Sequence, residues 1–253
     1  MRDDVGREAR AHVAVREGRS PKYPPGVIVT ISRGQIDNTT AIMRESIATP
    51  WGSKGCLRQS GVEIAHSRNQ IVRSVDELVP NWEWLLFIDS DHKLREYHYN
   101  TVMARLLDWD VPVVSGTVCR RSAPFRLNAF SSFDPPEDLK LADLDPDGLV
   151  KVAAVGMGFC LIRREAFNAV GDPWFRVGQE NPELGAEDLD FTWRCTQRGQ
   201  GVYVDQGLAI GHNLGPGVTV WPGAIDRRPF IELEGEETFM IPVFPRSRRE
   251  QGL

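Results

Sequence analysis

Residues 84–88, Trp-Leu-Leu-Phe-Ile, constrain the fold most, because these five bulky apolar residues are followed at once by Asp89, Ser90 and Asp91. A short apolar run that ends abruptly in charge is typical of a fully buried strand in an α/β sheet. In open α/β sheets, ligands bind beyond the carboxyl ends of the strands. We therefore predict that Asp89 and Asp91 lie at the edge of a ligand-binding crevice.

Two carboxylates one residue apart suit a hard divalent cation such as Mg²⁺ or Mn²⁺, which can in turn bind the phosphates of a nucleotide. The alternative is a solvated turn after a strand, since Asp and Ser favour turns. Two carboxylates cannot fill an octahedral shell, so His212 is a candidate for a further ligand. Its alternative role is that of a hydrogen-bonded structural histidine.

Strand-like and helix-like patterns alternate on both sides of this strand. They predict an α/β fold with a mostly parallel central sheet flanked by helices on both faces. The predicted strands are residues 26–31, 84–88 and 111–118, followed by two short strands or extended segments at 201–205 and 208–212 and one more strand at 238–244. The predicted helices are residues 41–48, 64–79, 102–107, 163–170 and 189–198. The Pro- and Asp-rich residues 130–148 are expected to leave the regular pattern as an excursion or flap.

The pattern also suggests three regions. We assign residues 1–25 to a flexible N-terminal arm, residues 26–213 to one domain, and residues 214–253 to a C-terminal extension that packs on the domain or is partly mobile. The sequence shows neither a signal peptide nor an apolar run of about 18 residues, so we expect a cytoplasmic protein without a membrane span. The net charge of −5 argues against a protein that grips long nucleic acid. The four cysteines are far apart and are expected to be reduced thiols.

Glu187 and Asp188 precede the predicted helix 189–198. Acidic residues there can simply complement the helix macrodipole and cap free N–H groups. Alternatively, one of them takes a proton from an attacking hydroxyl as a general base, and we prefer Asp188 for that role, with Glu187 second.

Several motifs occur in a fixed order: residues 86–91 (Leu-Phe-Ile-Asp-Ser-Asp), 156–167 (beginning Gly-Met-Gly), 185–191 (Gly-Ala-Glu-Asp-Leu-Asp-Phe), 199–205 (Gly-Gln-Gly-Val-Tyr-Val-Asp) and His212. This ordered set resembles GT-A-fold glycosyltransferases, most closely the family 2-like enzymes, including their short bacterial and phage forms. The resemblance covers about residues 27–213. It implies a GT-A fold, the Rossmann-like fold of nucleotide-diphospho-sugar transferases.

The resemblance further implies a nucleotide-sugar donor, most readily UDP- or GDP-linked, and a Mn²⁺ or Mg²⁺ ion. Asp91 and His212 would ligate the cation, Asp89 would lie near the ribose or the metal, and Asp188 would be the base if the enzyme inverts configuration. Residues 65–69, Ala-His-Ser-Arg-Asn, resemble the family's alanine-arginine-asparagine segment near the nucleotide, although His66 and Ser67 depart from it. No Gln-x-x-Arg-Trp motif is present, and a processive polysaccharide synthase is not expected.

Further candidates for contacts with the nucleotide sugar come from strand ends, from the segment 65–69 and from two glycines. They are Thr30, Ser32, Arg33, Arg68, Asn69, Asp89, Ser90, Gly156 and Gly158. The strand-end residues 30–33 have a solvated strand end as their alternative. Arg68 would pair either with a phosphate or with an exposed Glu, and the two glycines would let a sugar approach the backbone.

Two more pairs of side chains have both a functional and a structural interpretation. Arg120 and Arg121 follow a strand end and could meet the diphosphate or the acceptor, or form a solvated surface. Trp174 and Phe175 could stack on a sugar or belong to the core.

The predicted function is therefore a metal-dependent glycosyltransferase that moves a sugar from a nucleotide-diphosphate donor to an acceptor hydroxyl. The acceptor can be a saccharide, a protein or a modified nucleobase, although the acidic net charge weakens the last choice. Two alternatives remain: a metal-dependent phosphohydrolase or nuclease, and a nucleotide-sugar-binding protein without turnover.

Overall fold

The computed structural model describes residues 22–32, 38–60, 63–140, 148–177, 185–223, 229–233 and 241–242, with only the backbone at residues 38–39, 54–60 and 241–242. Arg33, residues 1–21 of the predicted arm, and all of the predicted strand 238–244 except Ile241 and Pro242 lie outside these ranges. The side chain of Cys56 is likewise not described.

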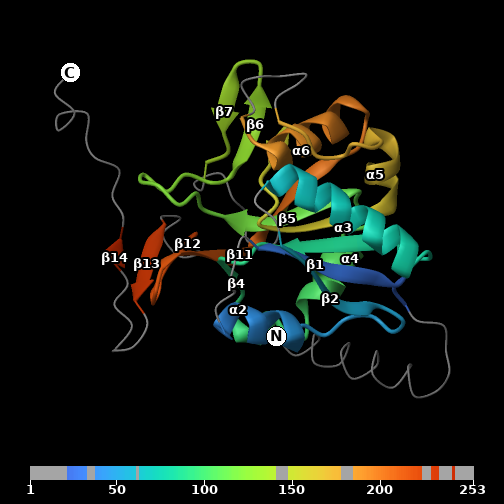
Figure 1. Ribbon diagram of the computed structural model, residues 1–253. Coiled ribbons are helices and arrows are strands. Elements are labelled where there is room, and N and C mark those ends of the chain that lie inside the picture. Colours follow the sequence, from blue (N-terminus) through green and yellow to red (C-terminus); the bar gives the residue numbers. More distant parts are fainter. Residues whose placement is uncertain are drawn as a thin grey trace.

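A large central sheet forms the middle layer of the molecule (Figure 1). Its inner strands run in the order β2 (Lys54–Ser60), β1 (Gly26–Ser32), β3 (Trp84–Ile88), β10 (Phe159–Arg163), β5 (Val113–Val118) and β11 (Val202–Gly215). Neighbouring pairs are parallel except at β10, which runs antiparallel to both β3 and β5. Five of these six strands therefore share one direction, as the predicted mostly parallel sheet requires.

Shorter strands extend the sheet beyond β11. Strands β12 (Val218–Trp221), β13 (Phe230–Leu233) and β14 (Ile241–Pro242) continue it antiparallel, and β4 (His92–Lys93) and β8 (Leu149–Lys151) also pair with β11. A separate three-stranded sheet contains β6 (Ala129–Phe133), β7 (Pro136–Asp138) and β9 (Ala154–Val155). The hairpin of β6 and β7 occupies part of the predicted excursion 130–148, and residues 141–147 of that excursion are not described.

Helices cover both faces of the central sheet (Figure 1). Helices α3 (Ile64–Leu78), α5 (Arg164–Val170) and α6 (Glu187–Gln197) lie on one face, and α2 (Asn38–Ser46) and α4 (Val102–Asp108) lie on the other. Because side chains of a strand alternate between faces, β3 contributes Leu85 and Phe87 to the first core and Leu86 and Ile88 to the second. All four are fully buried, which confirms the buried strand that the sequence predicts.

The order of strands and helices follows the prediction closely, with three differences. First, α2 spans Asn38–Ser46, whereas residues 41–48 were predicted as this helix. Second, several strands were not predicted: β2 and β4, whose sequences are short, polar and without alternation, β10 in the middle of the sheet, and the short strands β6 to β9, β12 and β13. Third, the two short segments expected at 201–205 and 208–212 form one strand, β11, which keeps pairing with β5 across an irregularity between Asp205 and Ala209.

The remaining helices and cysteines agree with their sequence patterns. Helix α5 ends at Gly171, whose φ of +77° is a backbone conformation that favours glycine at this position. Cys119, Cys160 and Cys195 are buried free thiols, and burial raises the pKa of Cys119 and of Cys195 to about 12. Within the described ranges, every helix is too short or too polar to cross a bilayer.

Candidate metal centre and acidic site

Three elements bring a small cluster of potential metal ligands to one edge of the sheet. Asp91 follows β3, His92 begins β4, and His212 lies on β11 directly opposite His92. Their ligand atoms all lie within 4.8 Å of one another. Nδ1 of His92 is 2.9 Å from Oδ1 of Asp91, and Nε2 of His212 is 3.4 Å from Oδ2 of the same carboxylate. The cluster thus unites Asp91 and His212, which the sequence proposed, with His92, which it did not.

His212 is oriented in the manner of a metal-binding histidine. Its Nδ1 atom is 2.8 Å from the carbonyl oxygen of Cys119, the residue that follows β5. A carbonyl can only accept, so Nδ1 carries a proton, and Nε2, which faces Asp91, is the nitrogen available to a metal ion. Metal-ligating histidines commonly donate their other ring N–H to a backbone carbonyl in this way.

The environment of Asp91 keeps its carboxylate ionised. Burial opposes ionisation, but hydrogen bonding to His212 and to His92 outweighs it, so the pKa of Asp91 lies well below its usual range. The guanidinium of Arg121 approaches within 3.3 Å of Oδ2 and is itself largely exposed. Asp91 can therefore act as an anionic ligand that remains partly open to solvent, with 31% of its side chain exposed.

His92 packs tightly inside this cluster. Its ring stacks on that of His212 with 4.4 Å between centroids, and its Nε2 is buried without a hydrogen-bond partner among the described residues. A Cβ added to Gly158 would come within 2.1 Å of Nε2. Gly158 therefore makes room for His92, whereas the sequence suggested that it makes room for a sugar. The position of His92 directly after Asp91 could have marked it as a ligand candidate. Adjacency in the sequence alone, however, does not show that two side chains point to the same site.

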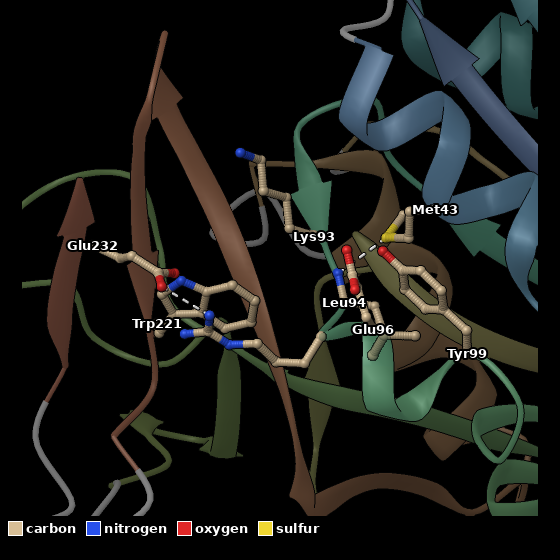
Figure 2. A pocket seen from close by; sticks show the side chains of 8 residues that line it. Met43, Lys93, Leu94, Glu96, Tyr99, Trp221 and Glu232 are labelled. Carbon is tan, nitrogen blue, oxygen red and sulfur yellow. Dashed lines mark hydrogen bonds and ion pairs between the residues drawn. The ribbon is translucent and has the colours of Figure 1, made fainter. Parts of the chain in front are cut away.

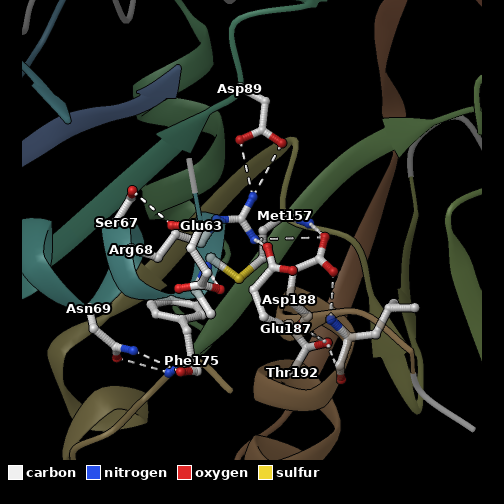
Figure 3. A network of polar contacts seen from close by, with 12 residues as sticks. Glu63, Ser67, Arg68, Asn69, Asp89, Met157, Phe175, Glu187, Asp188 and Thr192 are labelled. Carbon is white, nitrogen blue, oxygen red and sulfur yellow. Dashed lines mark hydrogen bonds and ion pairs between the residues drawn. The ribbon is translucent and has the colours of Figure 1, made fainter. Parts of the chain in front are cut away.

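A second network surrounds Arg68, which lies on α3 and is 2% exposed (Figure 3). Nη2 donates to both carboxylate oxygens of Asp89, at 3.1 and 3.2 Å. Nη1 lies 2.9 Å from Oε1 of Glu187 and 3.8 Å from Oδ2 of Asp188. Burial opposes the charge of Arg68, but the three carboxylates outweigh it and raise its pKa further. Arg68 thus holds the end of β3 to the start of α6, and its carboxylate partners are partly buried, unlike the exposed Glu considered above.

Asp89 belongs to this second network. Its carboxylate is engaged by Arg68, its backbone N–H donates to the carbonyl of Gly158 at 2.9 Å, and it does not belong to the cluster of Asp91, His92 and His212. Of the two acidic residues that follow β3, the structure therefore brings Asp91 to the candidate metal centre and Asp89 to Arg68.

Glu187 and Asp188 lie in the first turn of α6, where the N-cap residue Ala186 provides no side-chain cap. Oδ1 of Asp188 accepts from the N–H of Leu189 at 2.8 Å, and Oδ2 accepts from the N–H of Met157 at 3.1 Å. These two bonds fix the carboxylate beside the loop that precedes β10. Burial raises the pKa of Glu187, with Arg68 opposing that shift and Asp188 adding to it.

The other residues predicted to contact the nucleotide sugar lie in different surroundings. Thr30 and Ser32 are buried, and by strand alternation they share the face of Ile28, which packs in the core with α2 and α4. Neither is at a solvated strand end. Ser90 lies between the two networks and is partly exposed. A Cβ at Gly156 would come within 1.7 Å of Nδ2 of Asn128, so this glycine accommodates a side chain of its own chain.

Asn69, Phe175 and Trp174 have structural contacts. The Asn69 amide donates to the carbonyl of Phe175 at 2.7 Å and accepts from its N–H at 3.0 Å, which ties residue 175 to α3. Phe175 is 2% exposed and packs in the core, and Nε1 of Trp174 donates to the carbonyl of Phe167. Phe175 therefore belongs to the core, and Trp174 is partly buried and packs against it.

Arg120 also contacts other side chains of the protein and does not belong to a freely solvated surface. Its guanidinium lies 2.5 Å from Asp138 of β7 and 4.7 Å from the ring centroid of Phe130 on β6. Of the neighbouring pair, only Arg121 reaches the candidate metal centre.

Comparison with known proteins gives matches among solved structures only. No protein-family model and no curated protein matches the sequence. The crystal structure of A197 from STIV matches with a TM-score of 0.59 and 17% identity, over 86% of this chain and 97% of that one. This likeness, which spans nearly all of the viral protein, shows that the two chains share a fold.

Two matched structures carry glycosyltransferase names. One is GalNAc-T7 with UDP, GalNAc and Mn²⁺, with a TM-score of 0.49 and 12% identity over 77% of this chain and 45% of that one. The other is a glycosyltransferase involved in the glycosylation of the major capsid of PBCV-1, with a TM-score of 0.34 and 14% identity over 57% of this chain and 63% of that one. The structures that resemble this α/β chain thus include glycosyltransferases as well as a viral protein.

Proposed function

We propose that this protein is a metal-dependent glycosyltransferase that uses a nucleotide-diphosphate sugar. The observation that carries the proposal is the cluster of Asp91, His92 and His212 at the carboxyl end of β3, adjacent to the partly buried acidic network around Arg68. Its location fits the rule that ligands of open α/β sheets bind beyond the strand ends. The ordered motifs supply the reason for choosing a sugar nucleotide, with UDP or GDP as the first choices for its nucleotide part.

The donor set fits a divalent cation. Asp91 would contribute an ionised carboxylate, and His212 an imidazole nitrogen whose tautomer is fixed by Cys119. His92 is the third candidate ligand, because one ring nitrogen faces Asp91 and the other lacks a partner. Two imidazoles with one carboxylate favour Mn²⁺ over Mg²⁺, which prefers an all-oxygen shell. A cation bound there would neutralise charge on the departing diphosphate.

Arg121 would assist at the same place. Its guanidinium is 59% exposed and lies 3.3 Å from Asp91, so it can turn toward an anionic ligand without leaving a buried pair. Guanidinium groups bind phosphate oxygens through charge-assisted hydrogen bonds. Arg68, in contrast, is already surrounded by carboxylates and is the counter-charge of the acidic network in this proposal.

Asp188 would act as the general base in an inverting reaction. The acceptor O–H proton would pass to the Asp188 carboxylate while the acceptor oxygen forms a bond to the anomeric carbon. The bond from that carbon to the diphosphate oxygen would break at the same time, and the electron pair would leave with the nucleoside diphosphate. The backbone N–H groups of Leu189 and Met157 orient the carboxylate for this role. If configuration is retained, Asp188 does not serve as this base.

Turnover with nucleotide sugars tests the proposal. The purified protein is incubated with Mn²⁺ and UDP-, GDP-, CDP- or dTDP-linked sugars, with and without pools of saccharide and protein acceptors, and released nucleoside diphosphate is measured. We expect release from one donor class, at least about 100-fold reduced in Asp188→Asn, the scale of general-base catalysis. Asp172→Asn, at an exposed ion pair with Arg73, is the matched control and should retain turnover.

The same experiment separates the alternatives. Release of inorganic phosphate or of a nucleoside monophosphate with no sugar transfer would favour the phosphohydrolase. Donor binding without any product would favour a nucleotide-sugar-binding protein. Either result would contradict the transferase proposal.

A further inference from the structure

A cavity lies beside β4, lined by Lys93 of that strand together with Leu94 and Trp221 (Figure 2). Strand β4 pairs His92 with His212 and Lys93 with Gly211. Since successive side chains of a strand point to opposite faces, Lys93 lies on the face opposite to the metal ligands. Trp221 is on that face too, because a Cβ added to Gly211 would come within 2.7 Å of its indole ring. The cavity is therefore separated from the candidate metal centre by the sheet itself.

The cavity has a volume of about 260 Å³. Its walls come from α2, from the segment that runs from β4 to residue 99, and from β12 and β13. Among the described residues, the lining consists of Met43, Lys93, Leu94, Arg95, Glu96, Tyr99, Trp221 and Glu232. Small-molecule sites are usually about 300–1,000 Å³, so this space suits a ligand of about one ring.

One wall is a stack of a guanidinium group on an aromatic ring. The guanidinium carbon of Arg95 lies 3.8 Å from the ring centroid of Trp221, and Nη1 of Arg95 is 2.8 Å from Oε1 of Glu232. Trp221 is 3% exposed, and its indole N–H is buried without a partner among the described residues. The ion pair and the stacking both hold the Arg95 side chain, so this wall is more rigid than one formed by a free arginine.

The facing wall combines apolar and polar groups. Met43 is anchored by its sulfur, which accepts the N–H of Leu94 at 3.0 Å. Tyr99 and Glu96 come from the same side of the cavity, as Figure 2 shows. Burial raises the pKa of Tyr99, with a smaller contribution from the charge of Glu96, so its hydroxyl remains a neutral donor. Neither the Tyr99 hydroxyl nor the Glu96 carboxylate makes a hydrogen bond within the described part of the chain.

Among the lining residues that the structure describes, the charges balance, since Lys93 and Arg95 are opposed by Glu96 and Glu232. A ligand with a net charge would therefore gain little, in contrast to the nucleotide expected at the metal centre. Apolar and aromatic surface together with several hydrogen-bonding groups suits a compact ring that carries hydroxyl groups. We propose that this cavity binds one neutral saccharide unit, independently of metal and nucleotide.

Binding of free sugars to the full chain tests the proposal. Saturation-transfer NMR is recorded with D-glucose, D-galactose and their 2-N-acetylamino derivatives, in the presence of a chelator and without any nucleotide. At least one of these sugars should bind, and tryptophan fluorescence should titrate in parallel because Trp221 lines the site. Glu96→Ala and Tyr99→Phe should each weaken binding at least about fivefold, the loss of one hydrogen bond. Glu165→Gln, on the exposed surface of α5, should bind as the wild type does.

Three results would overturn the proposal: no sugar binds, binding is unchanged in both cavity variants, or a charged molecule competes with the sugar. Inorganic phosphate and free lysine are the charged competitors. Thermal unfolding of each variant checks that it is folded. Because chelator removes any contribution from the metal centre, failure here leaves the proposed transferase untouched. Conversely, loss of sugar transfer in an Asp188 variant leaves this binding intact.

Discussion

The ring nitrogen Nδ1 of His212 lies 2.8 Å from the carbonyl oxygen of Cys119, so the end of β5 determines which nitrogen of a β11 histidine faces Asp91. Two strand ends and the interior of a third strand thereby contribute to one cluster: β3 leads into Asp91, β5 into Cys119, and β11 carries His212. The position of the candidate metal centre is thus a property of the central sheet and not of a single loop.

His92→Phe should weaken Mn²⁺ binding at least about tenfold, since phenylalanine preserves the stacking on His212 but supplies no nitrogen. Calorimetric titration with Mn²⁺ measures the change. His98→Phe is the matched control, because His98 also contacts an aromatic ring, that of Tyr97, outside the cluster. Equal Mn²⁺ affinity in His92→Phe and the wild type would remove His92 from the ligand set.

Gly158→Ala should lower Mn²⁺ affinity without touching a ligand. The new Cβ would lie 2.1 Å from Nε2 of His92, so the ring must move relative to Asp91 and His212. Gly215→Ala is the control, because a Cβ there meets no atom within 4 Å. Unchanged Mn²⁺ affinity in Gly158→Ala would show that the position of the His92 ring does not matter for the metal.

Arg68→Met should destabilise the fold by about 2–3 kcal/mol, because it leaves the partly buried carboxylates of Asp89, Glu187 and Asp188 without their charge-assisted contacts. Denaturant unfolding measures the free energy. Arg73→Met, on the same helix at an exposed pair with Asp172, should cost less than about 1 kcal/mol. Similar losses in the two variants would contradict the role of Arg68 as the counter-charge.

Glu187 makes stability depend on pH. Its pKa is raised in the folded protein, chiefly by burial, so the folded state holds a proton more readily than the unfolded chain. The contribution of this group to the free energy of unfolding therefore rises as pH falls through its folded pKa toward the unfolded value near 4.5. Thermal unfolding from neutral pH downward should show the wild type gaining stability relative to Glu187→Gln. A constant difference between the two proteins would contradict the shift.

The sequence predicts the elements with strong apolar patterns and the residues at their ends. The burial of β3 follows from residues 84–88 alone, and the expected meeting of Asp91 with His212 is what the structure shows. The direction of β10 could not be read in the same way, because apolar periodicity carries no information about strand direction. β2 and β4 were missed because a central sheet can recruit short polar segments through backbone hydrogen bonds.

Side-chain convergence was harder to predict than the fold. Arg68 was expected near a phosphate, but three carboxylates from two distant segments surround it. Gly156 and Gly158 were expected to face a sugar, whereas Asn128 and His92 occupy the adjacent space. In each case the sequence identifies a residue whose chemistry or small size matters, but only the packing shows its partner.

Calorimetric titration with nucleoside diphosphates tests the central claim most directly. UDP, GDP, CDP and dTDP are each titrated with Mn²⁺ and with chelator into the wild type, Asp91→Ala and the control Asp172→Ala. We predict that one of them binds the wild type and the control with Mn²⁺, and that chelator and Asp91→Ala each abolish this binding. Absence of binding by all four with Mn²⁺, or equal binding in Asp91→Ala, would contradict a metal-dependent site for a nucleotide-sugar donor.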